Sequence, residues 1–87
     1  MHSLHIKAEG PNKAIACFDD EKEGSQYLTD GKYLYADFYR FDKCRKTDIV
    51  KMYSDNSPFR ILPGETCAEA VFRMAKAWSL TILSIQQ

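Results

Sequence analysis

The chain has 87 residues, of which 45% are hydrophobic and 28% charged, and its 12 basic side chains balance 12 acidic ones. This length predicts one compact domain over residues 1–87, and the hydrophobic content excludes long disordered stretches. A formal net charge of zero argues against a dedicated polyanion-binding protein. Because no apolar run is long enough to span a membrane and no signal-peptide pattern opens the chain, we expect a cytoplasmic protein without a membrane partner.

Two strands are predicted at the start of the chain. Apolar and polar residues alternate over residues 3–8, which predicts a half-buried strand, and Gly10 and Pro11 predict the turn after it. Residues 14–18 then favour a returning strand. An alternative has Asn12 capping a short helix that runs through residue 23, although such a helix would lack a continuous apolar face.

An acidic surface loop is predicted at residues 19–25. Its carboxylates are Asp19, Asp20, Glu21 and Glu23, and Gly24 and Ser25 close it. The loop is either a solvated connection or a negative patch that meets a basic surface of a partner protein.

The strongest hairpin signal is Asp30-Gly31, a pair typical of a type I′ turn. It joins a short strand at 27–29 to a long strand at 32–41. On the long strand, one side carries Leu34, Ala36, Phe38 and Arg40, and the other carries Tyr33, Tyr35, Asp37, Tyr39 and Phe41. We expect the first side to face the core at its centre, because Leu34, Ala36 and Phe38 have no polar side-chain atom that needs a partner. The tyrosine side is then at least partly exposed.

Residues 42–47 form a mostly basic connection, and residues 48–53 are predicted as the next strand. A turn at 54–58 and a short strand at 59–62 lead to Pro63-Gly64, which ends the preceding element.

An amphipathic helix over residues 66–78 is the firmest local prediction. Thr66 and Glu69 have the spacing of a capping box, in which each side chain accepts a hydrogen bond from the other residue's amide. The predicted buried stripe consists of Ala68, Val71, Phe72, Ala75 and Trp78. Glu69 also stands four residues before Arg73, which favours a weak ion pair on the exposed side.

The β-branched stretch at 80–85 predicts a final strand entered directly from the helix, with Ile82 sharing a side with Leu80 and Ser84. Since both of its sides carry apolar residues, we place it inside the sheet or in an oligomer contact. The predicted fold is therefore α+β: an antiparallel meander of about five to six strands, one C-terminal helix packed on one face, and this last strand.

No catalytic or metal site is predicted. His2 and His5 would point to opposite sides of a strand, and Cys17, Cys44 and Cys67 lack the spacing of a disulfide framework or a zinc site. Cys17 and Cys67 are expected in the core. The basic neighbours of Cys44 would lower its thiol pKa, but a nucleophile also needs a general base and an oxyanion site, and the sequence shows neither. We therefore expect a non-enzyme without a cofactor.

Binding is the remaining function class. Tyr33, Tyr35 and Tyr39 could form a protein-binding face, because tyrosine combines a rigid ring with a polar tip. Two other interpretations stay open: the rings form a second small core, or they stack on single-stranded nucleic acid beside a basic edge made of Lys32, Arg40, Lys43, Arg45 and Lys46.

A protein partner is the favoured hypothesis, with the tyrosines or the acidic loop as the contact. This description suits small accessory or inhibitor proteins of phages and mobile elements, of which anti-CRISPR-like inhibitors are one form. A homodimer is also expected, because a small sheet leaves unpaired edges.

Overall fold

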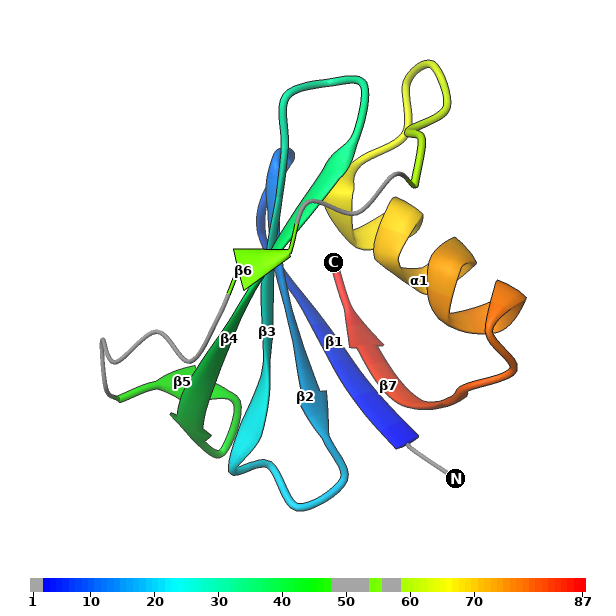
Figure 1. The fold of residues 1–87 in the computed structure, drawn as a ribbon. Coiled ribbons are helices and arrows are strands. Elements are labelled where there is room, and N and C mark those ends of the chain that lie inside the picture. Colours follow the sequence, from blue (N-terminus) through cyan, green and yellow to red (C-terminus); the bar gives the residue numbers. More distant parts are fainter. Residues whose placement is uncertain (1–2, 48–53, 56–58) are drawn as a thin grey trace.

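The structure, a computed structural model, describes residues 3–47, 54–55 and 59–87. A curled sheet carries one helix on one face (Figure 1). The strands lie in the order β5-β4-β3-β2-β1-β7, and β6 pairs with β4 outside that order. The elements are β1 (Ser3–Gly10), β2 (Lys13–Phe18), β3 (Glu23–Thr29), β4 (Leu34–Asp42), β5 (Arg45–Lys46), β6 (Ser54–Asp55), α1 (Cys67–Ala77) and β7 (Thr81–Gln86). From β1 to β5, sequence neighbours pair antiparallel, whereas β7 lies parallel to β1. The predicted α+β architecture is confirmed.

The main core lies between α1 and what we call the helix-facing side of the sheet. Leu34 and Ala36 are buried there, so the predicted core side of the long strand is confirmed. The sheet also contributes Leu4, Ile6, Ala14, Ala16 and Tyr27, and α1 contributes Cys67, Ala68, Ala70, Val71, Met74 and Ala75.

The predicted capping box is present at the start of α1. Glu69 donates its amide to the Thr66 hydroxyl at 3.2 Å, and the Glu69 carboxylate accepts the Thr66 amide at 2.9 Å. The placement of Trp78 in the buried stripe is wrong, because its side chain is 60% exposed. α1 ends at Ala77, and Trp78 is the C-cap before Ser79, whose φ of 59° turns the chain away. Within the described residues, no helix has the length and apolar character needed to cross a membrane.

A second, smaller core lies on the opposite side of the sheet, which we call the outer side. It consists of Ile15, Cys17, Tyr39 and Phe41, with Cys44 packed against it. A two-residue turn at Lys43 and Cys44 folds β5 back onto β4, and in this way the turn brings Cys44 to the cluster. Cys17 and Cys67 are both buried, as predicted.

The returning strand predicted at residues 14–18 is confirmed as β2, which spans residues 13–18. The alternative helix through residue 23 is therefore not formed. The loop after β2 is shorter than expected: β3 begins at Glu23, so Gly24 and Ser25 are paired strand residues opposite Cys17 and Ala16.

The Asp30-Gly31 hairpin is not a type I′ turn. Only Gly31 has a positive φ, of 94°, and the strands pair only from Thr29 and Leu34 outward. The Asp30 carboxylate explains the wider loop, because one of its oxygens accepts the amides of Lys32 at 2.8 Å and Tyr33 at 3.0 Å. This local hydrogen bonding competes with a tight hairpin.

The predicted strand at 48–53 lies outside the described residues. Ser54 and Asp55, predicted as part of a turn, form β6 and pair with Asp37 and Ala36 of β4. The predicted strand at 59–62 is reduced to one bridge between Arg60 and Tyr33.

β7 lies at an edge of the sheet beside β1, not inside it as one prediction had it. Ile82 is level with Leu4, but a register shift then places Ser84 beside His5. Paired residues on parallel strands point to the same side of the sheet. Ile82 therefore faces the helix, as Leu4 does, and Ser84 faces outward, as His5 does. The prediction that Ile82 and Ser84 share a side is therefore wrong.

Candidate functional site

The tyrosines predicted on one side of the long strand, Tyr33, Tyr35 and Tyr39, differ in exposure, and only the first two are accessible to solvent. Tyr33 is 38% exposed, and so is Leu28 of β3, which lies directly opposite the half-buried Tyr35. We call Leu28, Tyr33 and Tyr35 the open tyrosine patch.

A hydrogen bond fixes one ring of this patch. The Tyr35 hydroxyl donates to Asp30 at 2.9 Å, and this bond raises the pKa of Tyr35. The pKa of Asp30 is lowered, chiefly by the amides of Tyr33 and Lys32 and then by Tyr35. One surface carboxylate therefore binds both the hairpin backbone and the Tyr35 hydroxyl.

The third of these tyrosines is covered. Tyr39 is only 8% exposed, its ring is 6.4 Å from that of Phe41, and the Lys46 ammonium lies 4.7 Å from its centroid. Burial is the main cause that raises the pKa of Tyr39. The second-core interpretation thus holds for Tyr39, and Tyr33 and Tyr35 are the accessible predicted partner-binding rings.

The acidic loop is at the other end of the sheet. Figure 1 shows the connection of β2 to β3 at the opposite end from that of β3 to β4. Asp19, Asp20 and Glu23 are exposed there. Glu21 is directed elsewhere, since its Oε1 lies 3.6 Å from Nε2 of His5. The loop and the tyrosine patch therefore do not form one continuous surface.

The predicted basic residues are also divided. Lys46 lies over Tyr39 and donates to the Gln26 side chain at 3.1 Å. Lys32 is exposed in the β3–β4 connection, and Arg40 is exposed opposite Glu23. Only Lys43 and Arg45 meet at one place, in the cavity described next.

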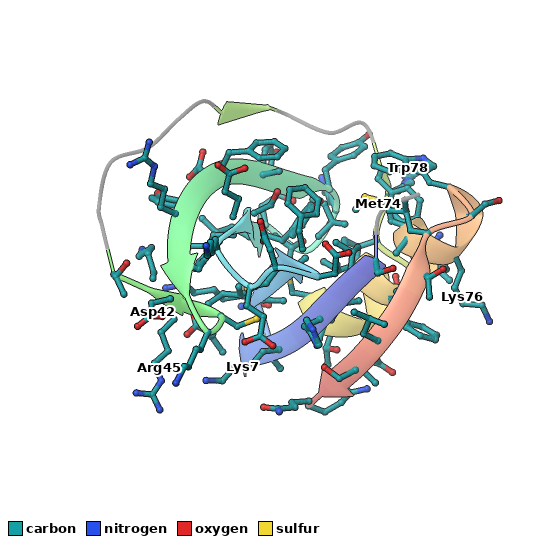
Figure 2. The ribbon with its side chains drawn as sticks, turned by 90° about the horizontal axis from the view of Figure 1, so that it is seen from below. Lys7, Asp42, Arg45, Met74, Lys76 and Trp78 are labelled. Carbon is teal, nitrogen blue, oxygen red and sulfur yellow. The ribbon has the colours of Figure 1, made fainter. Side chains whose placement is uncertain are left out.

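A polar cavity of about 260 Å³ lies on the outer side of the sheet and was not predicted. It is lined by His5, Ile6, Lys7, Glu21, Lys43, Cys44, Arg45, Ser84 and Gln86. Figure 2 shows two of its cations, Lys7 and Arg45, on the same edge of the molecule. Its residues come from β1, the acidic loop, the β4–β5 turn, the start of β5 and β7, and no local motif connects these segments.

The cavity contains groups that resemble acid–base machinery. His5 Nδ1 is hydrogen-bonded to the Ser84 hydroxyl at 2.8 Å, and its other nitrogen faces Glu21. Cys44 lines the same cavity, but burial raises its thiol pKa, which is the opposite of activation. The lowering expected from its basic sequence neighbours is not found: the opposing causes are a hydrogen bond with Cys17 and the charge of Lys7, and burial outweighs both. The arrangement orients His5 and leaves Cys44 a poor nucleophile.

The other two thiols, unlike Cys44, are fully buried. Burial raises the pKa of Cys67 to about 11 and that of Cys17 higher still. No group of three or more potential metal-binding side chains comes together in the part of the chain that the structure describes.

An apolar cavity of about 220 Å³ lies on the helix-facing side, at the end of α1. Its lining includes Phe18, Phe38 and the exposed Trp78. The sequence assigned Trp78 to the core, so this second exposed aromatic region was missed.

Comparisons of the chain with protein-family models, with curated proteins and with solved structures find no match.

Proposed function

We propose that this chain is a small non-enzymatic cytoplasmic protein that occupies a surface of a partner protein through the open tyrosine patch. The proposal includes the class of accessory or inhibitor proteins that phages and mobile elements encode, with anti-CRISPR-like inhibition as its most specific form.

The observation that carries this proposal is the fixed aromatic surface. Leu28 and Tyr33 are each 38% exposed, and the Tyr35 hydroxyl donates a hydrogen bond to Asp30 that holds its ring beside them. Ordered aromatic side chains dominate protein interfaces because they bury a large area at a low cost in conformational entropy.

A capture experiment tests the proposal. Tagged wild-type protein and the Tyr33→Ala/Tyr35→Ala variant are used to capture partners from a lysate of the native host, and the captured proteins are identified by mass spectrometry. The double variant should keep its fold, since Tyr33 is exposed and Tyr35 half-buried, and should lose at least about tenfold of the wild-type capture.

Two matched variants locate the contact. Trp78→Ala removes an exposed aromatic side chain at the other aromatic region and should retain capture. Asp19→Lys/Asp20→Lys tests the acidic loop. If the tyrosine variant captures the same partner as the wild type, the proposal is contradicted; loss of capture in the acidic-loop variant alone would assign the contact to that loop instead.

Single-stranded nucleic acid is the second candidate ligand. The observation that favours it is that Lys43, Arg45 and Lys46 lie on the same outer side of the sheet as Tyr35. The oligonucleotide titration described below tests this candidate.

A further inference from the structure

The polar cavity is lined by backbone in an uncommon conformation. Among the described residues, the non-glycine residues with positive φ are Glu21, Lys43, Cys44 and Ser79, with φ of 58°, 51°, 62° and 59°. The first three of them line this cavity. Side chains are disfavoured in the left-handed region, and such residues concentrate where geometry serves a function.

The consecutive pair Lys43 and Cys44 has a clear geometric effect. A two-residue turn with positive φ at both positions folds β5 directly back onto β4. The turn brings Lys43 and Arg45 to the cavity wall, while Cys44 packs against the second core and anchors the turn.

The cavity has an excess of positive charge. Lys7, Lys43 and Arg45 line it, and within the described residues none of the three is within ion-pair distance of a carboxylate. Glu21 is the one carboxylate in the lining, and it faces His5. Three cations against one anion favour an anionic ligand over a neutral or cationic one.

We propose that this cavity binds the phosphate group of a small molecule. The Arg45 guanidinium can bind two phosphate oxygens in its planar fork, and Lys7 and Lys43 add point charges from two other segments. The side chains of Ser84 and Gln86 supply neutral hydrogen-bonding groups, and the Ser84 hydroxyl is already held by His5. The volume of about 260 Å³ leaves room for a small organic group beside the phosphate.

This site is independent of the proposed protein contact, because the open tyrosine patch shares no residue with the cavity. A failure of one proposal therefore leaves the other standing.

The test is a titration with inorganic phosphate in chloride buffer, followed by NMR of the ¹⁵N-labelled protein. We expect saturable shifts at the amides of His5, Lys7 and Ser84. Arg45→Gln should weaken phosphate binding by about tenfold, because it removes a charge-assisted hydrogen bond. Lys32→Gln makes the same change in charge at the far hairpin and should leave the affinity within about twofold.

Two further ligands identify the source of the phosphate. Glycerol 3-phosphate represents a small monoester, and a single-stranded oligonucleotide without terminal phosphates represents a nucleic-acid backbone. Binding of inorganic phosphate or the monoester with the expected dependence on Arg45 supports the proposal. It is overturned if neither binds at tens of millimolar, if Arg45→Gln and Lys32→Gln weaken binding equally, or if only the oligonucleotide binds.

Discussion

At the residue scale, Gly24 explains why β3 can lie so close to β2. A β-carbon on this residue would meet the Ala16 carbonyl and would lie 2.8 Å from Cα of Cys17. Backbone atoms cannot move aside as a flexible side chain can, so only glycine fits this position without displacing a strand. The sequence suggested a loop here, because glycine is common in loops and the close approach is a tertiary feature.

We predict that Gly24→Ala lowers the free energy of unfolding by roughly 3 kcal/mol, the upper end for overpacking. Gly64→Ala provides the comparison, because Gly64 has a φ of 77° and open space around it. This control should cost only about 1 kcal/mol of backbone strain. Urea denaturation measures both, and an equal or smaller cost for Gly24→Ala would contradict the interpretation.

The tyrosines of the long strand differ in exposure, and this difference also arises at the residue scale. Alternation along β4 correctly placed Tyr35 and Tyr39 on one side of the strand. Alternation cannot show that the following turn folds back over one end of that side, which is what separates the covered Tyr39 from Tyr35.

At the element scale, Arg73 attaches the 59–65 segment to α1. Its guanidinium binds both carboxylate oxygens of Glu65 at 2.9 Å, donates to the Arg60 carbonyl at 2.6 Å and lies 4.4 Å from the Phe59 ring centroid. The expected pair of Arg73 with Glu69 does not form, because the Glu69 carboxylate serves the capping box. The four-residue spacing of Glu69 and Arg73 was correctly identified, but Arg73 pairs instead with Glu65, which is farther away in the sequence.

The ion pair of Arg73 and Glu65 predicts that the stability of the fold depends on pH. Arg73 is the main cause that lowers the pKa of Glu65, so the pair contributes stability above the ordinary glutamate pKa and loses it as pH falls through the lowered value. Arg73→Gln should therefore cost about 1 kcal/mol at pH 7, a figure reduced for solvent exposure, and less at pH 3. Lys76→Gln on the same helix is the control. A cost for Arg73→Gln that does not fall between pH 7 and pH 3 in chemical denaturation would contradict the assignment.

At the scale of the whole molecule, β7 forms an unprotected edge of the sheet. Residues 81–86 carry no charge and no proline, and Leu83 and Ile85 are 49% and 37% exposed. Natural edge strands are usually protected by charges, prolines or bulges that prevent further pairing. The register shift beside Leu83 is the only such feature seen here in the described part of β7.

We predict that β7 pairs with β7 of a second copy, so that the protein forms a homodimer. Sedimentation equilibrium should show a dimer that Leu83→Lys converts to monomer without loss of the fold, because Leu83 is already half exposed. Leu28→Lys, an exposed leucine on β3, should stay dimeric. A wild-type protein that is monomeric at about 100 μM would contradict this prediction.

The sequence alone determined those parts of the protein that depend on near neighbours in the chain. These are the capped helix, the alternation that divides β4 into two sides, and the order of the first four strands, the helix and the final strand. Hydrogen bonds and side-chain periodicity within a few residues are sufficient to specify such features. Tertiary structure decided which tyrosines are accessible, where Trp78 lies, and that His5, Glu21 and the cavity cations meet. These outcomes depend on how the sheet curls and on the positive φ of Glu21, of Lys43 and Cys44, and of Ser79, and they bring together segments that have no common local signal.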